Sequence, residues 1–87
     1  MIDEYIGQRV VIDLASPFVC LGTLLNFSDH CIELKNADFH DLRDTETTRE
    51  NYIAESRLTG IKRNRKRVLL FRRDVVAISR LDDVVDE

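Results

Sequence analysis

The chain has 87 residues, and its 13 basic and 16 acidic side chains give a formal net charge of −3. This length allows one domain, which we assign to residues 1–87. Hydrophobic residues make up 44% and charged residues 33%, close to the globular average, which argues against disordered and fibrous classes. No apolar run approaches the roughly 20 residues of a membrane helix, and the acidic N-terminus lacks the basic region of a signal peptide. We therefore expect a cytoplasmic protein without membrane association.

The N-terminal part of the chain predicts a short helix and one strand. Residues 1–8 place apolar side chains three and four positions apart, which favours one short helical stretch. Residues 9–15 put three apolar side chains on one face and an aspartate on the other, as a half-buried strand does. Ser16 and Pro17 end this strand, because proline cannot donate to the hydrogen-bond ladder.

Two further strands are predicted before the middle of the chain. Residues 18–27 are almost wholly apolar, and Gly22 in their interior indicates a bulge or tight bend, as at the corner of a small barrel. Residues 26–29 form a turn, and residues 31–37 then alternate as a half-buried strand. In this strand the inward side chains are Ile32 and Leu34, and the outward ones are Glu33 and Lys35.

The strand pattern lapses in a long polar excursion over residues 40–66. Thr47 followed by Glu50 three positions later is a capping-box pattern, and Gly60 fits the far end as a C-terminal cap. These signals predict a helix over residues 48–58, with an extended hairpin arm as the alternative. The apolar stripe of the helix would consist of Ala54 and Leu58 with Tyr52 or Ile53.

Residues 68–71 and 75–81 are the last two apolar, β-branched runs, and an acidic tail follows at residues 82–87. Five short strands predict a mainly β fold, in which a short N-terminal helix precedes a small closed or nearly closed barrel. The strands at 9–15 and 18–27 carry apolar residues on both faces. Because one core uses only one face, we expect the surplus to form contacts between subunits.

The basic residues are concentrated in one segment, residues 62–73, which contains no acidic residue. Outside it the chain has six basic residues against 16 acidic ones, a net charge of −10. Such a block indicates either a phosphate-binding patch or a solvated loop balanced by neighbouring acids. Its seven cations are Lys62, Arg63, Arg65, Lys66, Arg67, Arg72 and Arg73.

Two motifs in the strands resemble those of the Sm-like family. The first is an apolar run with a glycine at 18–24, a turn ending in His-Cys at 27–31, and an apolar strand at 32–37. The second, at 70–79, reads Leu-Phe-Arg-Arg-Asp-Val-Val-Ala-Ile-Ser. The resemblance covers residues 5–81 apart from the excursion. It implies an N-terminal helix, a five-stranded, strongly bent barrel of the SH3 type, and assembly into rings.

The departures from the family pattern concern its uridine pocket. His30 falls where many relatives have a histidine and Cys31 where they have a methionine, but Ile32 follows in place of the family's asparagine. The family's Arg-Gly pair is replaced by Arg72 and Arg73. An isoleucine cannot pair with a base edge as an asparagine does, so we expect no usual uridine specificity.

The resemblance and the basic segment together predict a nucleic-acid-binding protein. In a homo-oligomeric ring of five to seven subunits, each copy would add its cations to a rim able to bind single-stranded RNA. Phe27, Phe71 and Tyr52 are the aromatic residues that could stack bases. The alternative is a structural or protein-interaction ring that has lost RNA binding, with the tail and the excursion as contact surfaces. The predicted RNA-binding residues are His30, Lys62, Arg63, Arg65, Lys66, Arg67, Arg72 and Arg73.

Signals for catalysis are weak. The densest polar cluster is Asp38–Asp41, with His40 among the carboxylates, and Asp29–His30 is a second. Two histidines do not have the spacing of a zinc site, and the chain has neither a glycine-rich phosphate loop nor a nucleophile elbow. Cys20 and Cys31 are not a C-x-x-C pair and are interpreted as small buried hydrophobes. We therefore expect no enzymatic activity, no metal site and no cofactor.

Overall fold

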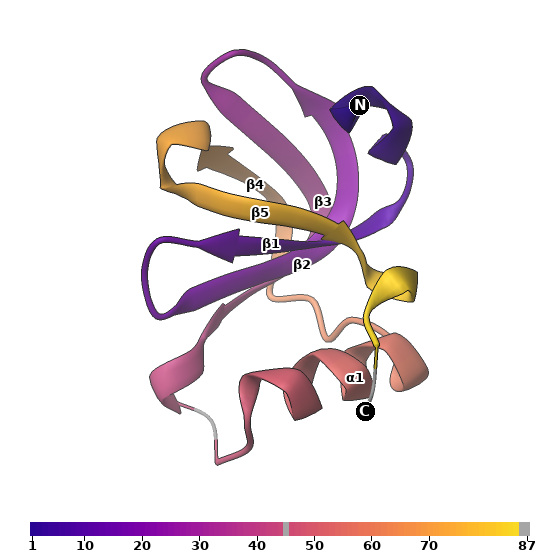
Figure 1. The fold of residues 1–87 in the computed structure, drawn as a ribbon, viewed down its shortest axis with the longest axis vertical. Helices are drawn as coiled ribbons and strands as arrows, with labels where there is room; N and C mark the ends of the chain where they lie inside the picture. Colours follow the sequence, from indigo (N-terminus) through magenta and orange to yellow (C-terminus); the bar gives the residue numbers. More distant parts are fainter. Residues whose placement is uncertain (45, 86–87) are drawn as a thin grey trace.

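The structure, a computed structural model, describes residues 1–44 and 46–85. These residues form one antiparallel sheet of five strands in the order β4-β3-β2-β1-β5, so the fold is mainly β, as predicted (Figure 1). Helical elements lie at the N-terminus and after β3, β4 and β5. The strands are β1 (Arg9–Leu14), β2 (Phe18–Phe27), β3 (Cys31–Asp41), β4 (Arg65–Phe71) and β5 (Val75–Arg80). The helices are α1 (Arg49–Thr59) and the 3-10 turns η1 (Ile2–Tyr5), η2 (Leu42–Asp44), η3 (Arg72–Asp74) and η4 (Leu81–Asp83).

All five predicted strands are present, but β3 and β4 are longer than the apolar pattern indicated. β3 continues to Asp41, which pairs with Phe18 of β2, and β4 begins at Arg65, which pairs with Ala37. Backbone hydrogen bonds hold these pairs whatever the side chain, so polar residues extend the ladder. The excursion between strands is therefore shorter than predicted, at residues 42–64.

Gly22 is required by the close approach of β3. The register of β2 against β3 shifts between Leu21 and Thr23, which is the irregularity predicted at this position. A Cβ added at Gly22 would lie 3.1 Å from the Ala37 Cβ and 3.2 Å from the Lys35 carbonyl oxygen. Any larger residue would have to push β3 away, so the glycine permits the two strands to meet.

The apolar residues form two clusters, one on each face of β1 and β2. The first cluster lies on the face that carries Val10 and Ile12, which we call the inward face. The second lies on the opposite face, which α1 and η4 cover (Figure 1). The expectation that the surplus apolar face is covered by another subunit is therefore wrong, because the excursion and the C-terminal turn of the same chain cover it. The first cluster contains Val10, Ile12, Cys20, Leu24, Ile32, Leu34, Ala37 and Leu70. The second contains Val11, Val19, Leu21, Ile53 and Leu81.

Helix α1 confirms the helix predicted in the excursion and excludes the hairpin arm. Thr48 is its N-cap, and its hydroxyl accepts a hydrogen bond of 3.1 Å from the Asn51 amide. The cap is one residue later than the predicted Thr47. Gly60 ends the helix with a positive φ of 99°, which suits glycine. The predicted apolar stripe is wrong at Leu58, which is 74% exposed; the buried residues are Ile53, Ala54 and Ser56.

A buried polar contact attaches α1 to β3. The Tyr52 hydroxyl donates to the carboxylate of Asp38, which is only 7% exposed, and the Tyr52 ring stacks on His40 with centroids 4.0 Å apart. Burial and the bond to Asp38 raise the pKa of Tyr52. Burial, with the nearby Asp38 charge, also raises the pKa of the Cys20 thiol to about 12. Tyr52 and Cys20 therefore both keep their protons beside the Asp38 carboxyl group at neutral pH.

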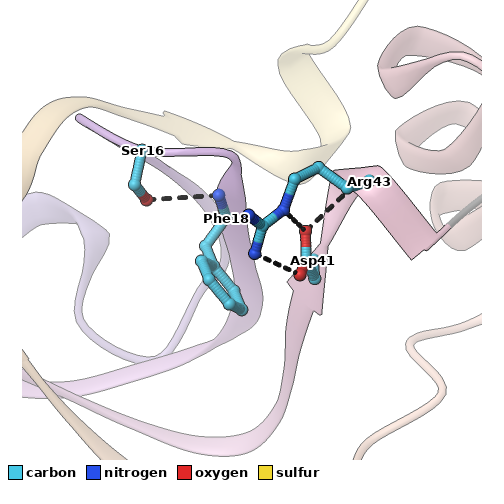
Figure 2. Close-up of polar contacts among 4 residues, drawn as sticks. All are labelled: Ser16, Phe18, Asp41 and Arg43. Carbon is cyan, nitrogen blue, oxygen red and sulfur yellow. Dashed lines mark hydrogen bonds and ion pairs between the residues drawn. The ribbon is translucent and has the colours of Figure 1, made fainter.

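A second polar contact lies where β3 ends and β2 begins (Figure 2). The Arg43 guanidinium donates to both carboxylate oxygens of Asp41, at 3.0 Å from Nε and 2.8 Å from Nη2. This pairing lowers the pKa of Asp41. The guanidinium also lies 6.0 Å from the ring centroid of Phe18, whose amide donates to the Ser16 hydroxyl at 3.2 Å. These contacts fix the start of β2 against the end of β3.

At the N-terminus, the predicted short helix is a single 3-10 turn. Ile2 and Tyr5 pack against the inward cluster, and Gly7 follows with a φ of 83°. The described residues contain no helix long and apolar enough to cross a membrane.

Candidate nucleic-acid interface

Strand β4 divides the predicted RNA-binding residues into two groups. Arg72 and Arg73 follow its last residue and lie at the β2–β3 turn, where His30 is located. The other predicted cations lie in the first residues of β4 and in the loop that leads to it from α1 (Figure 1). At about 3.3 Å per residue, the five steps from Arg67 to Arg72 separate the two groups by roughly 16 Å. The continuous basic block of the sequence is therefore not one patch. We call Lys62, Arg63, Arg65, Lys66 and Arg67 the helix-side cations.

At the turn end, η3 is bonded directly to the β2–β3 turn. The Arg72 amide donates to the His30 carbonyl at 2.8 Å, and the Arg72 Nη1 donates to the Ser28 carbonyl at 2.7 Å. A hollow of about 400 Å³ lies between these segments, and we call it the turn-side hollow. Two segments more than 40 residues apart in the sequence thus form one site. Its lining residues are Asp29, His30, Phe71, Arg72 and Arg73.

The β2–β3 turn is held in shape by its own serine. The Ser28 hydroxyl accepts from the amides of His30 at 3.3 Å and Cys31 at 3.1 Å, and the Ser28 amide donates to the Cys31 carbonyl at 2.8 Å. Serine commonly satisfies turn amides in this way. The turn therefore presents His30 on an ordered backbone.

The three aromatic candidates have different roles. Phe71 is 51% exposed, and the Arg73 guanidinium lies 5.4 Å from its ring centroid. Phe27 packs against the inward core, and Tyr52 is bonded to Asp38. Among these three, Phe71 is the most exposed and therefore the best placed to stack on a base, and it lies beside a cation that can meet a phosphate.

Ile32 does not take the place of a base-reading asparagine. It is 1% exposed and pairs with Phe27 on one side and Leu70 on the other, so its side chain belongs to the core. Cys31 is partly buried opposite Phe71, whereas Cys20 is fully buried as predicted. The turn-side hollow consequently has no amide side chain among its lining residues.

The helix-side cations are all exposed, and four of them have single contacts. Lys62 Nζ lies 3.9 Å from Glu55, and Arg63 donates to the Asn36 side chain at 2.8 Å. Arg65 donates to the Asn64 carbonyl at 3.1 Å, and Arg67 Nη1 lies 3.3 Å from the Glu33 carboxylate. Exposed pairs of this kind contribute about 0–1 kcal/mol. At this end Lys62 and Arg65 line two separate hollows, so these two cations do not share one ligand site.

A second hollow, which the sequence reasoning did not predict, lies on the outward side of the sheet beside the turn. It has a volume of about 100 Å³. Alternation in residues 31–37 indicated that Glu33 faces outward, but only the register with β4 shows that Leu69 stands directly opposite it. The hollow is lined by Asn26, Phe27, Ser28, Cys31, Glu33 and Leu69.

Both outer strands of the sheet have one free edge. Among the described residues, β4 pairs only with β3 and β5 pairs only with β1. Beside β4 lies a third hollow of about 460 Å³, whose walls include Leu14, Phe39 and Val68. Leu69 and Val76, on the two edge strands, are 54% and 69% exposed.

Within residues 1–44 and 46–85, no three His, Cys, Asp or Glu side chains are placed to hold a metal ion. No model of a known protein family matches the chain, and no curated protein sequence matches it. The fold and the site define a small, mainly antiparallel β domain. Its turn-side hollow combines an imidazole, a carboxyl group, two guanidinium groups and a half-exposed phenyl ring.

Proposed function

We propose that this protein binds single-stranded RNA, with a nucleotide held in the turn-side hollow of each subunit. The observation that carries the proposal is the pair of bonds from Arg72 to the β2–β3 turn, which brings His30, Phe71 and Arg73 around one hollow of about 400 Å³. Guanidinium groups bind phosphates bidentately, and an exposed aromatic ring stacks a base of any identity. Binding therefore does not require a specific sequence.

The same hollow supports a lack of strict uridine specificity. Reading a base edge requires a side chain with a defined pattern of donors and acceptors, as an asparagine has. The lining residues are cationic, acidic or aromatic, and Ile32 lies in the core. His30 is the lining group that can both donate and accept. We infer that contacts to phosphate and base stacking supply most of the affinity.

We further propose that the chain assembles as a homo-oligomeric ring of five to seven subunits, in the manner of the Sm-like family that its motifs resemble. The free edges of β4 and β5 support this, because an edge strand pairs readily with another chain. A contact from the β4 edge of one subunit to the β5 edge of the next is head-to-tail, which closes into a ring at a suitable rotation. Exposed Val76 on β5 would be covered in part.

The alternative is a structural ring that binds proteins and no RNA. Leu58 on α1, which is 74% exposed, is the observation that favours a protein contact on that side. Such a ring would leave the turn-side hollow without a ligand. The two functions differ in whether RNA binds at low salt.

The test is a titration of fluorescent single-stranded RNA at ~50 mM and ~200 mM salt, on protein whose subunit number is measured by native mass spectrometry. Affinity that falls by orders of magnitude between these salt concentrations supports phosphate contacts. Absence of binding at the lower salt concentration excludes the RNA function and favours the protein-interaction ring. A stable monomer contradicts the ring.

A further inference from the structure

The outward face of β3 and β4 continues from the turn-side hollow toward α1. Side chains directly opposite each other in an antiparallel pair project to the same face. Ile32, Leu34 and Leu70 are buried, so their neighbours along each strand face outward. The outward pairs are Cys31 with Phe71, Glu33 with Leu69, and Lys35 with Arg67.

The hollow of about 100 Å³ lies on this face, next to the turn-side hollow. Ser28 lines it and is followed in the chain by Asp29, which lines the turn-side hollow. Leu69 lines it and stands two residues before Phe71, which also lines the turn-side hollow. Outward residues of one strand are spaced by about 6.6 Å, so neighbouring nucleotides of one strand can occupy both hollows.

The carboxylate of this second hollow favours a hydrogen-bond donor. A carboxylate only accepts hydrogen bonds, and the Glu33 side chain is 35% exposed. The Asn26 side-chain oxygen Oδ1 already accepts from the Phe27 amide at 2.9 Å, so the Asn26 amide nitrogen can donate to an acceptor on the same base. Adenine, cytosine and guanine carry an exocyclic amino group that can donate to Glu33, whereas uracil has carbonyl oxygens and no exocyclic donor. Exposed Leu69 offers an apolar contact for the base.

The surroundings of the hollow favour a polyanion in spite of Glu33. The Arg67 guanidinium lies 3.3 Å from the Glu33 carboxylate and offsets its charge. Exposed Lys35 stands opposite Arg67 and adds a second cation on this face. A strand leaving the turn-side hollow along β4 therefore meets cations on both sides of the carboxylate, which is complementary to a phosphate backbone.

We propose that this second hollow is a base-selective subsite, in which Glu33 accepts from the exocyclic amino group of adenine, cytosine or guanine and disfavours uracil. The proposal rests on the proposed RNA function, since the base belongs to the strand held in the turn-side hollow. Glu33 then determines which base is preferred, whereas Arg72 and Arg73 supply the affinity for RNA of any sequence.

The test compares binding of adenosine, cytidine and uridine oligomers of equal length by fluorescence anisotropy. We expect the wild-type protein to bind the adenosine and cytidine oligomers about 10-fold more tightly than the uridine oligomer. Glu33→Gln should bring this ratio close to one, because an amide both donates and accepts. The matched control is Glu50→Gln, the same change on α1 at a side chain that is 77% exposed, and it should keep the wild-type ratio.

Leu69→Ser provides a second variant, because Leu69 is exposed and its loss does not open the core. It should reduce affinity for the adenosine and cytidine oligomers severalfold. A Glu33→Gln protein that binds RNA with the wild-type ratio overturns the subsite and leaves the proposed function intact, as does a wild-type preference for uridine. Failure of the wild-type protein to bind any of the three oligomers overturns both proposals.

Discussion

The two ends of β4 use the same residue types in different ways. At the turn end, Arg72 makes two hydrogen bonds to the β2–β3 turn, and Arg73 lies over the ring of Phe71. At the other end, Lys62 and Arg67 each have one exposed acidic partner. The turn end therefore gathers its two arginines in one hollow, whereas at the α1 end Lys62 and Arg65 line two separate hollows.

This difference shows that charge which is continuous in sequence need not be continuous in space. Four residues of β4, 68–71, lie between the groups, and a strand is the most extended way to separate them. Local charge attracts a polyanion from solution, but a site also needs walls from segments that only the fold brings together. The predictions below test whether the turn end binds and the α1 end mainly attracts.

The largest effect is expected for neutralising the turn end. Changing Arg72→Gln together with Arg73→Gln should lower RNA affinity about 100-fold at ~50 mM salt, because two phosphate contacts are lost and Arg72 no longer bonds the turn. Fluorescence anisotropy measures the loss. Circular dichroism checks that the sheet is retained. A loss of less than about threefold would show that the hollow does not bind the RNA.

Removing the buried contact at the α1 end should affect stability and leave binding unchanged. Tyr52→Phe deletes the donor to buried Asp38, and we expect the free energy of unfolding to fall by about 1–3 kcal/mol. Denaturant unfolding measures this. Tyr5→Phe is the matched control, since the Tyr5 ring lies under the Arg80 guanidinium and keeps that contact without its hydroxyl. If both variants lost the same free energy of unfolding, the hydrogen bond from Tyr52 to Asp38 would not be what stabilises this end.

Alkaline pH should destabilise the same end. The pKa of Cys20 is raised from 9.0 to about 12, so above pH 9 the unfolded chain loses a proton that the folded chain keeps. Stability present below pH 9 is therefore lost as the pH rises toward 12, by up to about 1.4 kcal/mol per pH unit. Unfolding measured from pH 8 to 11 tests this. Cys20→Ala should flatten the decline; an unchanged pH dependence would assign it to other groups.

The smallest effect is expected for the helix-side cations. Lys66→Gln with Arg67→Gln removes the same charge as the turn-end double variant, so the two are directly comparable. Affinity should fall about threefold to tenfold, and the dependence of log affinity on log salt should decrease by roughly two. The titration is the one used for the turn-end variant. If this variant lost more RNA affinity than the Arg72 and Arg73 variant, the α1 end and not the turn end would be the main binding site.

The pattern of apolar residues predicted the strands because each half-buried strand leaves a local signal with a period of two. Gly22 and Gly60 were identified for the same reason, since a bulge and a helix C-terminus both favour glycine locally. The capping threonine was predicted within one residue. The end of β3 and the start of β4 carry polar residues, so their pairing left no such signal.

The candidate site was predicted only in part. His30, Arg72 and Arg73 were singled out from motif resemblance, and they lie together. The remaining five predicted residues lie apart from them, and the exposed ring of Phe71 was not distinguished from that of Phe27. The exposed fraction of a side chain depends on which neighbours pack against its strand, and these neighbours come from segments distant in the sequence.

The sequence by itself determined the five strands, the helix in the excursion and the uneven distribution of charge, because each is encoded by residues close together in the chain. Only the tertiary structure decided what covers the second apolar face and which cations share a hollow. α1 and η4 fold over Val11 and Leu21, and η3 bonds to the β2–β3 turn. Both arrangements depend on sheet order and register, which join residues far apart in the sequence.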